Sequence, residues 1–200
     1  VRALSGGTFA GGLWSFTTPT FIDQGAYRVR VRARDNALPG GNLQPIISSI
    51  TFTIDSNAPG VGVTYPIGLP LAAGNLKSLS VISGTASDQF GIQSASMSVQ
   101  EADTLMYYDQ ATGTFSAVTQ QLLATTLVGS APNYTWSRPA VPLLDNKNYN
   151  LQARARDVSG NDSSLSSVVT FRYDITPPVA GVNLPAAGSF LKVLATVTGT

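Results

Sequence analysis

The chain of 200 residues contains no cysteine and no histidine. Without cysteine it forms no disulfide bond and offers no thiolate ligand to a metal ion. Without histidine it lacks the side chain that most often acts as a general base or binds a transition metal, and a Ser-His-Asp relay is excluded. We therefore expect a protein that is not an enzyme, with no catalytic residues and no bound cofactor.

Charge and long hydrophobic runs are also scarce. Only 12% of the residues are charged, and 12 basic against 11 acidic side chains leave a net charge of +1. This balance generates no long-range field that would attract nucleic acid, so we expect no nucleic-acid partner. No apolar run reaches the roughly 18 residues that a membrane-spanning helix needs, and we expect no membrane insertion.

What the sequence does contain favours β structure. Hydrophobic residues make up 43% of the chain, and 19 glycines with 12 prolines are typical of short strands joined by turns. Between residues 59 and 177, alternating polar and apolar positions predict strands at 61–65, 78–85, 93–100, 105–108, 119–127, 134–138, 149–157 and 168–173. No segment shows a sustained helical period. The pattern predicts an all-β fold of antiparallel β-sandwiches.

The chain repeats itself. The segment "YRVRVRARD" from Tyr27 returns as "YNLQARARD" from Tyr149, which is 149 minus 27, or 122 positions later. Two further pairs of segments keep the same order, "ITFTID" with "VTFRYD" and "APGVGVTYP" with "PPVAGVNLP". A repeat of roughly 115 to 120 residues predicts a tandem array.

The repeat divides the chain into three segments. Residues 1–58 are interpreted as the C-terminal part of one copy, 59–177 as a complete copy and 178–200 as the N-terminal strands of a following copy. The sequence begins at Val1 with neither a methionine nor a signal segment. We therefore expect a piece of a longer chain.

The segment from Tyr149 illustrates how a strand of the complete copy divides into two faces. Successive side chains point to opposite sides of a strand, which predicts that Tyr149, Leu151, Ala153 and Ala155 face the core. A tyrosine begins this segment after "LLDNKN" and its counterpart after "FIDQGA". That position predicts a tyrosine corner, in which the hydroxyl hydrogen-bonds the preceding backbone.

The outer face of the first version carries an unusual row of arginines. The row consists of Arg28, Arg30, Arg32 and Arg34. In the second version the first two positions hold Asn150 and Gln152, so only polarity is repeated. The favoured interpretation is a solvated sheet face with aliphatic stems covering apolar surface. A charged contact with a neighbouring copy or a lateral partner remains the alternative.

Acidic residues offer few candidates for chemistry. Glu101 with Asp103, or Asp157 with Asp162, are possible carboxylate pairs, but aspartates in glycine-containing turns commonly bind their own backbone. Calcium at the junctions between copies is the better-motivated alternative. Its ligands would come from Asp55 or Asp174 before the linker and from Asp88 or Asp157 in nearby loops. Because calcium takes six to eight oxygens and no dense acidic motif is present, we assign no metal ligand.

Four aromatic residues bear on ligand binding. Trp14 and Trp136 occupy equivalent positions in the repeat, which favours a core role over stacking on a sugar. Tyr107 and Tyr108 are the surface candidates, since the first copy has Val1 and Arg2 there.

Several motifs of the complete copy form a recognisable set, among them "VISGTASDQFGIQSASMSVQ", "YTWSR", "YNLQARARDVSGND" and "VTFRYDITPP". They resemble the bacterial immunoglobulin-like repeats of large secreted and surface-anchored, adhesin-like proteins. The first copy departs from this pattern with "DNALPGGN" in place of "DVSGN" and "DSNAP" in place of "DITPP". The resemblance covers nearly the whole chain and implies tandem immunoglobulin-like sandwiches.

The resemblance also implies a function. It points to a noncatalytic structural segment of a bacterial extracellular or cell-surface protein, forming a stalk or a fibre. Its partners would be neighbouring repeats of the same chain or filament, and a host or cell-surface ligand. The alternative is an adhesive or carbohydrate-binding module that acts through loops such as "NALPGG" or "YYDQATG".

Overall fold

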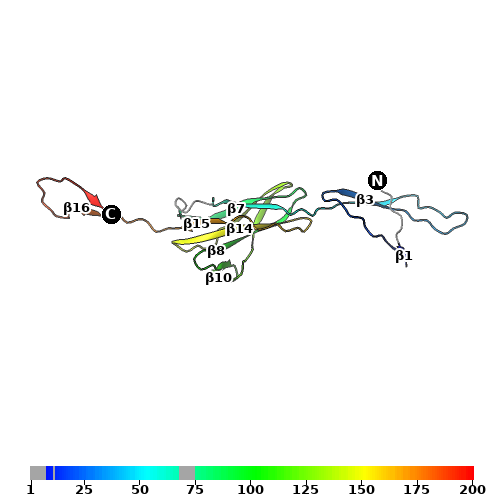
Figure 1. Ribbon diagram of the computed structural model, residues 1–200, viewed down its shortest axis with the longest axis horizontal. Coiled ribbons are helices and arrows are strands. Elements are labelled where there is room, and N and C mark those ends of the chain that lie inside the picture. The colour runs from blue at the N-terminus through cyan, green and yellow to red at the C-terminus, as the bar shows by residue number, and fades with distance from the viewer. Residues whose placement is uncertain (1–7, 11, 68–74) are drawn as a thin grey trace.

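The computed structural model describes residues 8–10, 12–67 and 75–200. This part of the chain is all-β and contains no helix, so it has no helix that could span a membrane. Its strands lie in three groups that follow one another along the long axis of the molecule (Figure 1). The all-β prediction is therefore confirmed. Val1 and Arg2, which the repeat aligns with Tyr107 and Tyr108, lie outside the described residues.

The first and last groups consist of antiparallel two-stranded ladders. In the first group β1 (Thr8–Ala10) pairs with β2 (Leu13–Ser15), and β3 (Ala26–Val31) pairs with β4 (Ser48–Thr53). In the last group β16 (Val182–Leu184) pairs with β17 (Thr198–Gly199). We call the β3–β4 unit the N-terminal hairpin.

The middle group, here named the central sandwich, consists of β5 to β15. Its strands are β5 (Gly60–Tyr65), β6 (Asn75–Leu76), β7 (Val81–Ser87), β8 (Ile92–Glu101), β9 (Tyr107–Asp109), β10 (Thr114–Ala117), β11 (Leu123–Ala124), β12 (Thr126–Ser130), β13 (Asn133–Pro139), β14 (Lys147–Asp157) and β15 (Val169–Tyr173). One sheet has the order β10-β9-β8-β14-β15-β6, with β11 on β8. The other has the order β12-β13-β7-β5.

The two sheets of the central sandwich enclose a single hydrophobic core. The larger sheet contributes the predicted face of β14, whose residues Tyr149, Leu151, Ala153 and Ala155 are at most 2% exposed. The smaller sheet contributes Trp136, whose indole N–H donates to the Thr85 carbonyl at 3.2 Å. The bulky indole lies directly over Gly84, where any side chain would collide with it. The alternation in the sequence thus identified the buried face correctly.

The observed strands differ from the predicted ones in three places. The predicted strand at 119–127 is two strands, β11 on the larger sheet and β12 on the smaller, because the chain crosses between sheets there. Neither β6 nor β10 is among the predicted strands. Strand β6 runs along the edge of the larger sheet beside β15 and pairs with it in parallel. The sandwich is therefore not entirely antiparallel.

Large apolar side chains of the first and last groups are exposed. Trp14 is 53% exposed although its counterpart Trp136 is buried, so its predicted core role is wrong for this structure. The reason is that β2 pairs only with β1, and no second sheet covers it among the described residues. Ile50 of β4 and Val182 of β16 are open to solvent in the same way.

Candidate functional site

The tyrosine corner is present twice. The hydroxyl of Tyr149 accepts a hydrogen bond from the backbone N–H of Leu144 at 2.7 Å. The hydroxyl of Tyr27 accepts one from Ile22 at the same distance. Each ring also stacks on a phenylalanine of the next strand, Tyr149 on Phe171 and Tyr27 on Phe52. The prediction from the repeated tyrosine is therefore confirmed.

The aspartate in each of these corners binds the segment that leaves the same copy. Asp23 accepts the backbone N–H of Ser56 at 2.6 Å, and Asp145 accepts that of Ile175 at 2.7 Å. The hydrogen bond from the Ser56 backbone holds the pKa of Asp23 below its ordinary value. The pKa of Asp145 is also lowered, mainly by the hydrogen bond from the Thr176 hydroxyl and next by that from the Ile175 backbone. The exit of each copy is therefore tied to its own corner.

The segment after β4 is also tied to the central sandwich. Ser159, in the turn between β14 and β15, donates its hydroxyl to the Asp55 carboxylate at 2.8 Å. In the same turn, the side-chain amide of Asn161 donates to the Asp55 carbonyl at 3.1 Å. Asp55 therefore connects the hairpin's exit segment to the sandwich that follows.

The turn that holds Asp55 is organised by Asp157. This aspartate is fully buried, and its carboxylate accepts the backbone N–H groups of Gly160 and Asn161 at 2.7 and 2.8 Å. Desolvation acts to raise the pKa of Asp157, but the hydrogen bonds from Asn161 and Gly160 outweigh it and the pKa lies below 3.8. The prediction that this aspartate binds its own turn is confirmed.

The longer turn of the first copy has the same hydrogen-bonded pair of an aspartate and an asparagine. Asp35 accepts the backbone N–H of Asn42 at 2.6 Å and its side-chain amide at 2.9 Å. Asn161 makes the equivalent side-chain bond to Asp157, also at 2.9 Å. The departure of "DNALPGGN" from "DVSGN" therefore changes the length of the turn and not its anchoring pair.

Three of the four carboxylates considered for calcium come together at this junction. Oxygens of Asp55, Asp88 and Asp157 all lie within 4.8 Å of one another. Asp174 is not among them, because it follows β15 and instead accepts the N–H of Thr176. Among the described residues, no lysine or arginine forms an ion pair with this acidic cluster.

The acidic cluster has the ligand type that hard cations prefer, but its capacity is partly used. Three carboxylates supply at most six oxygens, the lower end of what calcium takes. Asp88 already accepts the backbone N–H groups of Phe90 and Gly91, and Asp157 accepts three hydrogen bonds from its turn. The cluster can act as a hydrogen-bonded clamp by itself, and a cation would have to share these oxygens.

Basic side chains neutralise Glu101, Asp103 and Asp162, which belong to the other two proposed carboxylate pairs. Lys147 lies 2.8 Å from Glu101 and 3.6 Å from Asp103, and Glu101 holds the pKa of Lys147 above its ordinary value. Asp162 pairs with Arg154 at 3.1 Å. Asp157 and Asp162 do not act as a pair either, because Asp157 binds the backbone of its own turn and Asp162 binds arginine. The ion pairs of Glu101, Asp103 and Asp162 are therefore best explained as structural contacts.

The aromatic candidates are less accessible than the sequence indicates. Tyr108 is buried and contacts Phe115 edge-on, with ring centroids 5.5 Å apart. The prediction that it lies at the surface is wrong, because β9 continues the larger sheet and alternation turns Tyr108 toward the core. Tyr107 stays partly exposed. The adhesive alternative therefore loses one of the two side chains that supported it.

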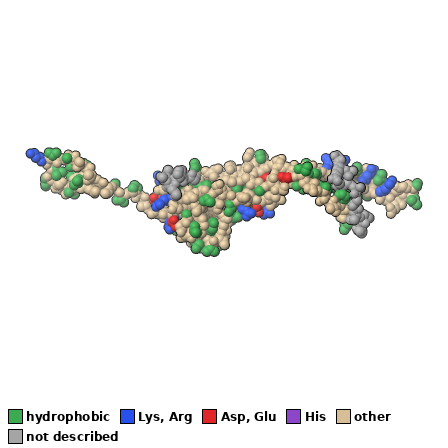
Figure 2. Space-filling model, in the orientation of Figure 1, with side chains coloured by type: hydrophobic (Ala, Val, Ile, Leu, Met, Phe, Trp, Pro, Cys, Tyr) green, Lys and Arg blue, Asp and Glu red, His purple; other side chains and the backbone are tan. Residues whose placement is uncertain are grey.

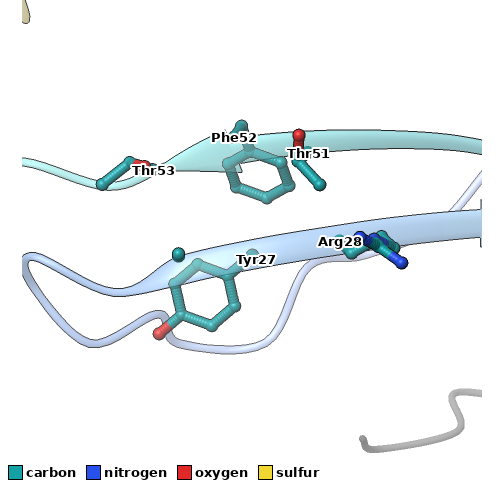
Figure 3. Close-up of a pocket in the computed structure, with 6 residues that line it drawn as sticks. Tyr27, Arg28, Thr51, Phe52 and Thr53 are labelled. Atoms are coloured by element: carbon teal, nitrogen blue, oxygen red, sulfur yellow. The ribbon is translucent and has the colours of Figure 1, made fainter.

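The N-terminal hairpin bears a hollow of about 430 Å³, lined by Ala26, Tyr27 and Arg28 of β3 and by Thr51, Phe52 and Thr53 of β4. The rings of Tyr27 and Phe52 lie side by side there (Figure 3). Their centroids are 5.8 Å apart, against 5.6 Å for the buried pair Tyr149 and Phe171. The two rings therefore pack like a core pair, although no second sheet covers them among the described residues.

Comparison with known proteins gives no family assignment. No family model matches the chain, and no curated protein matches it. The functional interpretation therefore depends on the repeated turns, the junction contacts and the surface charges described above.

Proposed function

We propose that this chain is a noncatalytic structural segment of a bacterial extracellular protein, in which tandem immunoglobulin-like β-sandwiches form a surface stalk or a fibre. The resemblance of its repeated motifs supports the family. The two-sheet packing of the central sandwich is compatible with it. The function follows from how successive copies are joined.

The observation that carries the proposal is the two-sided anchoring of the segment between the hairpin and the central sandwich. On one side Asp23 holds the backbone of Ser56, and on the other Ser159 and Asn161 hold Asp55. A bend at this junction would break hydrogen bonds on one side or the other. A junction held in this way favours a fixed angle between copies and transmits tension along the chain.

One side of this anchoring, the bond to the corner aspartate, recurs at the next junction. Asp145 binds the exit segment at Ile175, as Asp23 does at Ser56. Pro177 and Pro178 follow after Thr176, and proline restricts both its own φ angle and the residue before it. Junctions that are stiffened in the same way after each copy suit an extended array, because the length of such an array grows with the number of copies.

Electron microscopy of the native assembly that contains this segment tests the proposal. Sandwiches of constant spacing that meet end to end, with free sides, would identify a stalk. An ordered polymer with side contacts between copies would identify a fibre. Copies folded back on one another in a compact body would contradict both forms of the proposal.

A further inference from the structure

Arg28 and Arg30 of the arginine row lie on the outward face of the N-terminal hairpin, and Arg32 and Arg34 follow the end of β3. Arg28 and Arg30 stand opposite Thr51 and Ser49 of β4, which are exposed and uncharged. Arg32 donates its Nε–H to the carbonyl of Gln44 at 2.8 Å. Among the described residues, none of the four arginines forms an ion pair with a carboxylate.

The two arginines of β14, on the equivalent strand of the central sandwich, are neutralised. There Arg154 and Arg156 share Asp162, at 3.1 and 3.5 Å. The residue after the anchoring asparagine is Asp162 in that turn and Leu43 in the first copy. Residues 28–34 thus contain two more arginines than residues 150–156 and lack the acid that would balance them.

The charges of whole segments differ in the same direction. Residues 1–58 contain five arginines against three aspartates, a net charge of +2, while the equivalent residues 107–177 contain five basic and five acidic side chains. The three aspartates are Asp23, Asp35 and Asp55, and each already accepts hydrogen bonds from backbone N–H groups. The arginine charges are therefore available to an external anion.

The arrangement of the row suits an extended polymer. Arg28 and Arg30 lie in β3 and, as alternate residues of a strand, are about 7 Å apart on one face. Arg32 and Arg34 follow the end of β3, where an antiparallel bridge joins Arg34 to Leu43. Figure 2 shows basic side chains gathered over this end of the molecule. Each guanidinium can bind a carboxylate or sulfate with two parallel N–H groups.

From these observations we infer that the outward face of the N-terminal hairpin binds a linear acidic polysaccharide. The arginines pair with its carboxylate or sulfate groups. The exposed hydroxyls of Ser49 and Thr51, directly across from Arg30 and Arg28, bind its sugar hydroxyls. This ligand surface goes beyond the proposed structural role and does not depend on it.

Two other occupants fit less well. A second copy of this chain would need free carboxylates, but those of the central sandwich are taken up by ion pairs or by turn backbone, as at Glu101, Asp109 and Asp162. Nucleic acid would need a wider basic footprint or aromatic rings to stack on bases. The aromatic rings of the hairpin, Tyr27 and Phe52, belong to its opposite face.

The test is retention of the whole chain on immobilised heparin and on immobilised polygalacturonate at about physiological salt. The variant Arg28→Asn with Arg30→Gln copies the residues at equivalent positions of β14, so the fold should tolerate it. We expect it to bind about tenfold more weakly than the wild type. Retention on one column and not the other identifies sulfate or carboxylate as the anion.

Three controls make the result decisive. Arg154→Asn with Arg156→Gln removes the same charge from neutralised positions and should bind like the wild type. Arg28→Lys with Arg30→Lys keeps the charge and loses the paired N–H groups, so it should bind more weakly than the wild type and more strongly than the neutral variant. Circular dichroism checks that each variant folds. The inference would be overturned if Arg28→Asn with Arg30→Gln and Arg154→Asn with Arg156→Gln lost the same amount of binding. It would also be overturned if the wild type were retained on neither column. Stronger retention on DNA than on either polysaccharide would assign the face to nucleic acid instead.

Discussion

The hydroxyl of Ser159 donates a hydrogen bond to the carboxylate of Asp55 at 2.8 Å, although the two residues are 104 positions apart in the chain. Asp55 belongs to the segment that leaves the hairpin, and Ser159 to a turn of the central sandwich. The contact is therefore a direct tie between consecutive structural units, and its removal can be tested without touching either core.

Ser159→Ala should make this junction more flexible. The substitution removes the bond to Asp55, and because the site is exposed the free energy of unfolding should change by no more than about 0.5 kcal/mol. Small-angle X-ray scattering should show a broader distribution of interatomic distances. Ser164→Ala, at an exposed serine of the same turn region, is the matched control. Identical scattering of the two variants would mean that the bond does not hold the junction.

Tyr149→Phe should destabilise the central sandwich by about 1 to 2 kcal/mol, because it leaves the N–H of Leu144 without a partner beside the core. Tyr27→Phe removes the same bond from a more exposed setting and should cost less. Urea unfolding followed by the fluorescence of buried Trp136 measures the first cost. Equal stability of Tyr149→Phe and the wild type would show that the corner is dispensable.

Gly84→Ala should be strongly destabilising, by about 3 kcal/mol or more, since the new methyl group would collide with the carbonyl of Gly62 and with the indole of Trp136. Gly62→Ala is the matched control on the neighbouring strand, where the nearest atom to a new Cβ is 3.9 Å away. Thermal unfolding should separate the two variants clearly. Similar unfolding temperatures would contradict the packing described here.

Acid should destabilise the central sandwich through Asp157. The folded-state pKa of Asp157 lies below its ordinary value of 3.8, so its stabilising effect is present above that pH and is lost as the pH falls through the folded pKa. Asp157→Asn should lower stability at pH 7 by roughly 2 kcal/mol, because it loses charge-assisted hydrogen bonds. It should also weaken the dependence on acid. Unfolding curves between pH 2 and 7 give both quantities, and an unchanged acid dependence would assign the effect to other carboxyl groups.

The expectation of calcium at the junction predicts that calcium at millimolar order raises the unfolding temperature of the wild type. Asp88→Asn should reduce that rise, since it removes one carboxylate of the acidic cluster. Asp174→Asn makes the same charge change away from the cluster and is the control. No response in the wild type would leave Asp55, Asp88 and Asp157 as a hydrogen-bonded clamp alone.

Local features were predictable because they depend on short stretches of chain. The alternation in β14 predicted its buried face, and the position of Tyr149 predicted its hydrogen bond to Leu144 five residues earlier. Both are set by backbone geometry within one strand or turn. Tyr108 was missed because its short strand does not by itself show which neighbour it joins.

The recurring segments, the all-β character, the corners at Tyr27 and Tyr149 and the uneven distribution of arginine can all be read from the order of the amino acids. The meeting of Asp55, Asp88 and Asp157, and the exposure of Trp14 while Trp136 is buried, depend on the folded arrangement of the chain. Periodicity and turn chemistry act over a few residues, whereas convergence and burial depend on which distant strands pair and which sheet covers them.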